Sequence, residues 1–140
     1  MQYVEHIGIA VKNLEESNAL FSSLLGVFPY KMETVASEHV RTSFFRKGET
    51  KIELLESTAD DGPIGKFIEK RGEGIHHIAF EVQDIREEMQ RLSEAGFRLL
   101  NEEPKMGADH KLVCFIHPKS ANGVLIELCQ TVQDPEMSEG

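Results

Sequence analysis

The sequence repeats itself at about half its length, and this repeat constrains the fold more than any other feature. Residues 6–16, HIGIAVKNLEE, align with residues 77–87, HIAFEVQDIRE, at an offset of 71 residues (77 − 6). The alignment places His6 over His77. In both copies a polar residue stands three positions before a glutamate, which is the capping-box pattern that opens a helix. A chain of 140 residues built in this way predicts two similar modules.

Each copy predicts a strand, a helix and three further strands. The first helix begins after Asn13 and is expected to end at Gly26, and the second begins after Asp84 and is expected to end at Gly96. Short apolar segments separated by turn or charged residues follow each helix. These predicted strands are 27–33, 39–48, 50–56, 97–103, 111–118 and 123–130.

The repeat and its connector define the expected domain organisation. Residues 1–131 form one domain, in which 1–57 are the first module and 75–131 the second. Residues 58–74 are a linker helix, because a proline stands near their start and a glycine near their end. The short polar segment 132–140 is expected to be a disordered tail.

Side chains on successive strand residues point to opposite faces, so the strands can be divided into two sides. In HIGIAV the bulky apolar residues alternate with His6 and two small residues, and in HIAFEV they alternate with His77, Ala79 and Glu81. In the last strand of each copy, Glu53 and Glu127 alternate with apolar residues. The apolar side has to pack against the helices. Two histidines and two glutamates therefore occupy equivalent positions on the other face. His76 is expected to point away from them and to have a structural role.

Two imidazoles and two carboxylates suit a borderline divalent metal such as Co²⁺, Ni²⁺, Mn²⁺, Fe²⁺ or Zn²⁺. A single buried histidine is more often a packing residue, and a single glutamate near a strand end is more often solvated. All four residues, however, fall on matched faces of a repeat. The predicted fold class is thus α+β, with two tandem βαβββ modules that form a curved, barrel-like mixed sheet around a metal site.

Composition narrows the possible partners. The formal net charge is −9 and the pI is near 5.1, which argues against nucleic acid or an anionic membrane as a partner. No apolar run approaches the roughly 20 residues that a membrane span needs, and the N-terminus lacks the pattern of a signal peptide. The two cysteines form no CxxC pair and are expected to stay reduced. A cytoplasmic location is expected.

Several blocks resemble a known family. The repeated βαβββ unit with its His–Glu–His–Glu set resembles the vicinal oxygen chelate superfamily, which includes the glyoxalases and bleomycin resistance proteins. Within it, ETKIELLE, GIHHIAFEV, EEPKMGA and HPKSANGVLIEL resemble the methylmalonyl-CoA epimerase family. The likeness extends from Val4 to Gln130. The resemblance implies metal ligation by His6, Glu53, His77 and Glu127, an acyl-CoA substrate and a homodimer.

The same resemblance implies a mechanism. Methylmalonyl-CoA would chelate the metal through its thioester carbonyl and carboxylate, and the metal would stabilise the enolate left when the C2 proton departs. Glu127 is the implied base on one face of that enolate. Lys105 and Lys119 are candidates to bind the CoA phosphates, although each could equally be a solvated charge.

The chain departs from the family pattern at two places. Several relatives carry a second proton-carrying glutamate where this chain has Thr42, and threonine is a poor acceptor at neutral pH. Glu53 ranks first as its replacement, ahead of Glu38, His39 and a metal-bound water. The loop that contains Asp109 and His110 also differs, since relatives have small residues there.

Other members of the superfamily supply the alternatives. A glyoxalase-I-type lactoylglutathione lyase uses the same kind of metal set. A non-enzymatic, drug-sequestering binder of the same fold should have no metal set. Dioxygenases of the fold usually keep two histidines and only one carboxylate.

Overall fold

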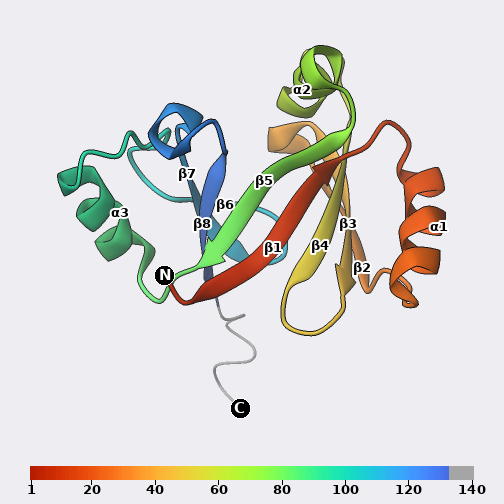
Figure 1. The fold of residues 1–140 in the computed structure, drawn as a ribbon, viewed down its shortest axis with the longest axis horizontal. Helices are drawn as coiled ribbons and strands as arrows, with labels where there is room; N and C mark the ends of the chain where they lie inside the picture. Colours follow the sequence, from red (N-terminus) through yellow and green to blue (C-terminus); the bar gives the residue numbers. More distant parts are fainter. Residues whose placement is uncertain (133–140) are drawn as a thin grey trace. The chain divides into compact units, whose positions relative to one another are not determined.

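The computed structural model describes residues 1–132 and divides them into two compact units. The first unit is His6–His77, and the second comprises Met1–Glu5 with the described residues from Ile78 onward (Figure 1). The predicted module boundaries are not tested by this division, since β1 (Tyr3–Ala10) and β5 (Gly74–Glu81) each contribute to both units. The expected tail lies outside the described residues except for its first position.

The first unit contains the predicted strands and helices of the first copy. Its strands follow the order β2-β3-β4-β1, and all neighbouring strands are antiparallel except β4 and β1, which are parallel. The elements are α1 (Leu14–Leu25), β2 (Lys31–Val35), a 3₁₀ turn η1 (Ala36–Glu38), β3 (Val40–Arg46), β4 (Lys51–Ser57) and α2 (Pro63–Arg71). The connector thus contains helix α2.

The second unit repeats this topology in the order β5-β8-β7-β6, with β5 and β8 parallel. Each unit therefore combines parallel and antiparallel strand pairs, which confirms the mixed sheet that the sequence predicts. The elements of the second unit are α3 (Ile85–Glu94), β6 (Lys105–Met106), β7 (Lys111–Ile116), a 3₁₀ turn η2 (Pro118–Ala121) and β8 (Ile126–Thr131).

The prediction of a strand over residues 97–103 is wrong. Only Leu99 in this segment forms a bridge, to Ile116, and the short strand β6 follows instead at 105–106. Asn101 explains the interruption, because its side-chain Oδ1 accepts the amide hydrogen of Phe115 at 3.0 Å. In a regular strand pair a backbone carbonyl would accept the Phe115 amide hydrogen, but here the Asn101 side chain accepts it instead.

Both helix starts are capped as the sequence predicts. Asn13 Oδ1 accepts the amide hydrogen of Glu16 at 3.0 Å, and Asp84 Oδ1 accepts that of Glu87 at 3.1 Å. Helix α1 ends at Gly26, whose φ of 74° is the left-handed conformation that glycine adopts without strain. The capping and turn chemistry therefore sets where these helices begin and end.

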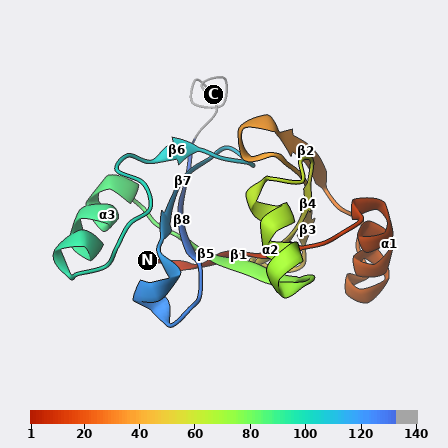
Figure 2. The ribbon, with the colours of Figure 1, turned by 90° about the horizontal axis from the view of Figure 1, so that it is seen from above.

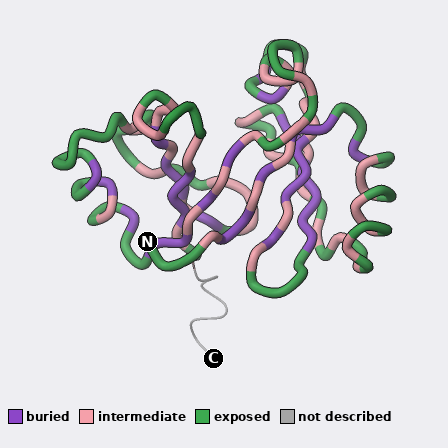
Figure 3. The backbone as a smooth tube through the Cα atoms, in the orientation of Figure 1, coloured by how far each residue is buried: buried purple, intermediate pink, exposed green. Residues whose placement is uncertain are grey.

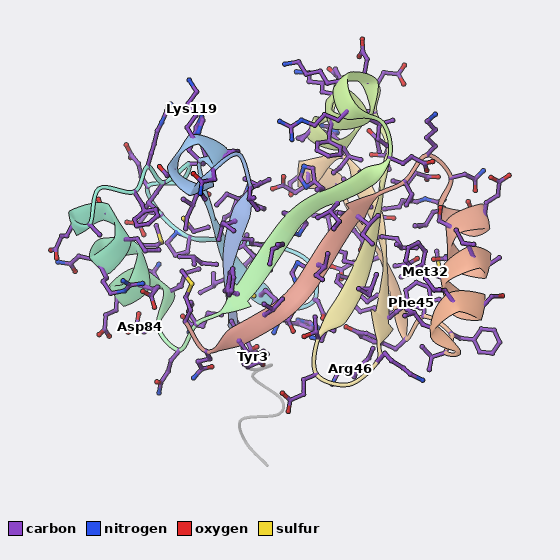
Figure 4. The ribbon with its side chains drawn as sticks, in the orientation of Figure 1. Tyr3, Met32, Phe45, Arg46, Asp84 and Lys119 are labelled. Atoms are coloured by element: carbon purple, nitrogen blue, oxygen red, sulfur yellow. The ribbon has the colours of Figure 1, made fainter. Side chains whose placement is uncertain are left out.

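In the first unit, α1 and α2 lie on opposite faces of β3 and β4 (Figure 2). The face toward α1 is apolar, and Phe45 points from β3 toward this helix (Figure 4). The buried residues of this cluster are Val11, Leu14, Phe45 and Leu54. Helix α2 covers part of the other face through Ile64, which packs with Ala10, Val40 and Leu55. The rest of that face carries the polar residues described below.

The second unit has its own apolar core and one buried ionic group. Helix α3 packs on β7 and β8. All three elements contain buried residues (Figure 3). Lys111 is buried with its Nζ 3.4 Å from Glu81 Oε2 and 3.7 Å from Glu5 Oε2. Within residues 1–132, no helix is long and apolar enough to cross a membrane.

Candidate functional site

His6 and His77, the first and last residues of the first unit, face each other through their ring nitrogens. His6 on β1 and His77 on β5 are 5% and 4% exposed, and their Nε2 atoms lie 3.0 Å apart. The rings are nearly perpendicular, with centroids 5.1 Å apart. Two imidazole nitrogens thus face each other in a buried position.

Glu53 completes this group from β4. Its Oε1 lies 3.4 Å from the Nε2 of His6 and 3.4 Å from the Nε2 of His77, and its side chain is also buried. Burial raises the pKa of this carboxyl, but the hydrogen bond with His77 and the positive charge of both histidines outweigh burial and lower the pKa overall. Glu53 is therefore held as a carboxylate between the two rings.

The spacing of these three atoms fits a first-row divalent metal. With metal–ligand bonds of about 2.1 Å, ligand atoms lie about 3.0 Å apart at right angles and about 3.4 Å apart at the tetrahedral angle. The observed separations among the two Nε2 atoms and the Glu53 Oε1 are 3.0 and 3.4 Å. Two imidazoles and a carboxylate are also a donor set that such ions prefer.

Gly8 makes room for the His77 ring. Gly8 lies opposite Glu53 in the parallel register of β1 and β4, so both are on the same face. A Cβ atom at Gly8 would lie 2.1 Å from His77 Cε1 and 2.5 Å from His77 Nδ1. The sequence suggested only that small residues line this face. The structure shows that the His77 ring occupies the space that a Cβ atom at position 8 would need.

The ring of His76 does not point away from the group as expected. His76 Nδ1 lies 2.9 Å from His77 Nδ1, and the His76 ring makes an edge contact with Phe67 of α2, with centroids 5.0 Å apart. Burial, followed by the charge of His77, lowers the pKa of His76 to about 4. His76 is therefore a neutral partner of His77. The doubled histidine in the sequence was the only signal of this contact.

Comparison with known proteins identifies the family. Residues 5–115 match the model of the Glyoxalase/Bleomycin resistance protein/Dioxygenase superfamily. An ethylmalonyl-CoA/methylmalonyl-CoA epimerase of Cereibacter sphaeroides is 43% identical over 129 residues, which cover 91% of this chain and 96% of the relative. The chain belongs to the methylmalonyl-CoA epimerase family.

The chain is also similar to two further proteins over nearly its whole length. An uncharacterized protein of Bacillus subtilis is 39% identical over 134 residues, covering 96% of each chain. A solved methylmalonyl-CoA epimerase, in complex with methylmalonyl-CoA and NH₄⁺, superposes with a TM-score of 0.91 at 31% identity, covering 94% of this chain and 96% of that one. The two-module fold predicted from the repeat is thus the fold of this family.

Glu127, the fourth ligand that the family resemblance implies, lies in the second unit. It is buried on β8, opposite Ala79 of β5 and Phe115 of β7. The pairing of Ala79 with Glu127 repeats that of Gly8 with Glu53, because both are parallel pairs between the first and last strands of a copy. The two glutamates that the sequence aligns thus occupy equivalent positions in the strand registers of the two copies.

Thr42, one of the positions where the sequence departs from the pattern of the family it resembles, has an acidic neighbour on the adjacent strand. Glu33 on β2 is directly opposite Thr42 on β3, so both side chains lie on the face that carries Glu53. The Glu33 Oε1 is 3.2 Å from the Nζ of Lys31, and the Glu33 side chain is 30% exposed. The sequence alone does not indicate Glu33, because the pairing of Glu33 with Thr42 depends on where β2 begins.

The two lysines considered for CoA binding are on short elements of the second unit. Lys105 begins β6 and is exposed, and Lys119 lies in η2 and extends away from it (Figure 4). The backbone amide of Lys119 donates to His117 Nδ1 at 3.0 Å, which fixes this turn.

Proposed function

We propose that this chain is a methylmalonyl-CoA epimerase, which interconverts (2R)- and (2S)-methylmalonyl-CoA by removing and returning the C2 proton. The observation that carries this proposal is the nearly full-length match to epimerases at up to 43% identity. The buried group of His6, Glu53 and His77 supports it, because this group suits the metal chemistry of the superfamily.

The proposed metal site comprises His6, Glu53, His77 and Glu127. The first three are supported by their mutual distances, and Glu127 by its equivalence to Glu53 in the repeat. A bound divalent ion, one of Co²⁺, Ni²⁺, Mn²⁺, Fe²⁺ or Zn²⁺, would act as a Lewis acid toward the substrate's thioester carbonyl. Water is excluded from the three ligands of the first unit by burial, which strengthens their electrostatic effect on a developing negative charge.

Inversion at C2 requires proton carriers on both faces of a planar intermediate. Glu127 is proposed to serve one face and Glu53 the other, because both are buried carboxylates. Glu33 is a rival for the second role, since it stands beside Thr42 on the same face as Glu53. Glu33→Gln distinguishes them: isotope exchange at C2 without inversion in this variant would assign the second face to Glu33.

Binding of the CoA moiety is proposed to involve Lys105 and Lys119. Both are cations of the second unit that can reach phosphate oxygens without desolvation of a buried charge. Lys105→Ala and Lys119→Ala should raise KM for the acyl-CoA and leave kcat unchanged. A cytoplasmic homodimer is the proposed state, and sedimentation measurements would test the dimer.

The test of the proposed function is a coupled assay. Metal-reconstituted protein is incubated with the methylmalonyl-CoA isomer that a stereospecific mutase cannot use. The mutase can then act only on inverted product, so its turnover measures inversion. We expect activity that chelation abolishes and a divalent metal restores. Absence of inversion with all five metals, together with conversion of methylglyoxal and glutathione to a thioester absorbing at 240 nm, would instead assign a glyoxalase-I-type lyase.

A further inference from the structure

We propose that His76 is a positioning residue that accepts the Nδ1 proton of His77 and so keeps the Nε2 lone pair of His77 available for the metal. This inference rests on the proposed metal site. The contact that carries it is the 2.9 Å separation between the two Nδ1 atoms.

The protons on a neutral imidazole decide which nitrogen of His77 can bind a metal. A neutral ring has one N–H and one lone pair, and a metal ligand must offer the lone pair. The Nε2 of His77 faces His6 and Glu53, so it is the nitrogen that the metal would use. The proton of His77 must then be on Nδ1, and Nδ1 faces His76.

His76 can accept that proton's hydrogen bond only when its own Nδ1 carries a lone pair. A neutral His76 ring that accepts at Nδ1 has its own proton on the other nitrogen. The ring is held in place by Phe67, against which it makes its edge contact, and Phe67 packs with the apolar cluster beneath α2. Helix α2 is thereby given a role in orienting a metal ligand.

Metal binding should therefore select one tautomer pair. Without metal, the Nε2 of His77 can carry the proton and face Glu53 at 3.4 Å, while His76 donates from its Nδ1. With metal on Nε2, the direction of the Nδ1–Nδ1 hydrogen bond reverses. Acceptors that hold the second nitrogen of a ligating histidine typically contribute about 10–100-fold in metal affinity.

The experiment measures Zn²⁺ affinity and histidine tautomers in the full-length protein. His76→Phe keeps an aromatic ring beside Phe67 but removes the acceptor, whereas His76→Asn restores an oxygen near the position of Nδ1. We expect about 10–100-fold weaker Zn²⁺ binding for His76→Phe by calorimetry and recovery of most of that loss in His76→Asn. In ¹⁵N NMR of the Zn²⁺ form, His77 should be protonated at Nδ1 and His76 at Nε2.

Two results would overturn the inference. One is unchanged Zn²⁺ affinity in His76→Phe, and the other is a proton on Nδ1 of His76 in the Zn²⁺ form. Thermal unfolding of the metal-free variants separates positioning from folding, because a purely structural role would lower the stability of His76→Phe and His76→Asn alike without rescue of affinity. Failure of the wild-type protein to bind any metal would refute the proposed metal site itself, which is a different outcome.

Discussion

Gly8→Ala should displace a metal ligand without removing any ligand atom. The new Cβ would lie 2.1 Å from His77 Cε1, whereas carbon atoms in contact are normally about 3.5–4.0 Å apart. The His77 ring must therefore retreat by about 1.5 Å. Such overpacking typically costs about 1–3 kcal/mol of stability. Because metal–ligand distances tolerate changes of only about 0.2 Å, we expect Zn²⁺ affinity to fall by at least about tenfold.

A double-mutant cycle isolates the cause. In a His77→Ala background the ring is absent, so Gly8→Ala should be neutral or should stabilise by up to about 1 kcal/mol through reduced freedom of the unfolded chain. Urea unfolding of the four metal-free proteins gives the coupling energy, which we expect to be about 1–3 kcal/mol. Equal destabilisation by Gly8→Ala in both backgrounds, or unchanged Zn²⁺ affinity in the single variant, would refute this reasoning.

Three further predictions concern stability. Asn13→Ala and Asp84→Ala should each lower the free energy of unfolding by about 1 kcal/mol, because each removes the side-chain acceptor at a helix start; an unchanged urea midpoint would contradict this. Lys111→Met should cost about 3–5 kcal/mol by leaving two buried carboxylates uncompensated, whereas the matched change Lys119→Met at an exposed turn should cost less than about 0.5 kcal/mol. Metal-free protein should lose stability as the pH falls from about 6.5 to about 4, because the unfolded chain then binds a proton on His76 that the folded chain, with its lowered pKa of about 4, does not. This contribution is at most about 3 kcal/mol and should disappear in His76→Phe.

The sequence was sufficient wherever local chemistry or strand alternation decides the structure. The helix caps at Asn13 and Asp84 and the equivalent strand positions of Glu53 and Glu127 follow from patterns within short segments. The repeat supplied the decisive information, because it aligned His77 rather than its neighbour with His6.

The sequence was insufficient where side chains from distant segments meet. Strand alternation fixes the direction of a Cβ atom, but it does not fix where a ring with two side-chain torsions ends, so the His76–His77 contact was missed. The place of Glu33 beside Thr42 depends on the start of β2, which lies four residues after the start of the predicted segment 27–33. Likewise, the short strand β6 is displaced because the Asn101 side chain interrupts the preceding ladder.

The most direct test of the account follows the C2 proton itself. Metal-reconstituted protein is incubated with a single isomer of methylmalonyl-CoA in D₂O, and deuterium uptake at C2 is followed by NMR while inversion is followed with the stereospecific mutase. We predict deuterium incorporation together with inversion, and the loss of both on chelation or in His77→Ala. No exchange at C2 with any of the five metals would contradict the account.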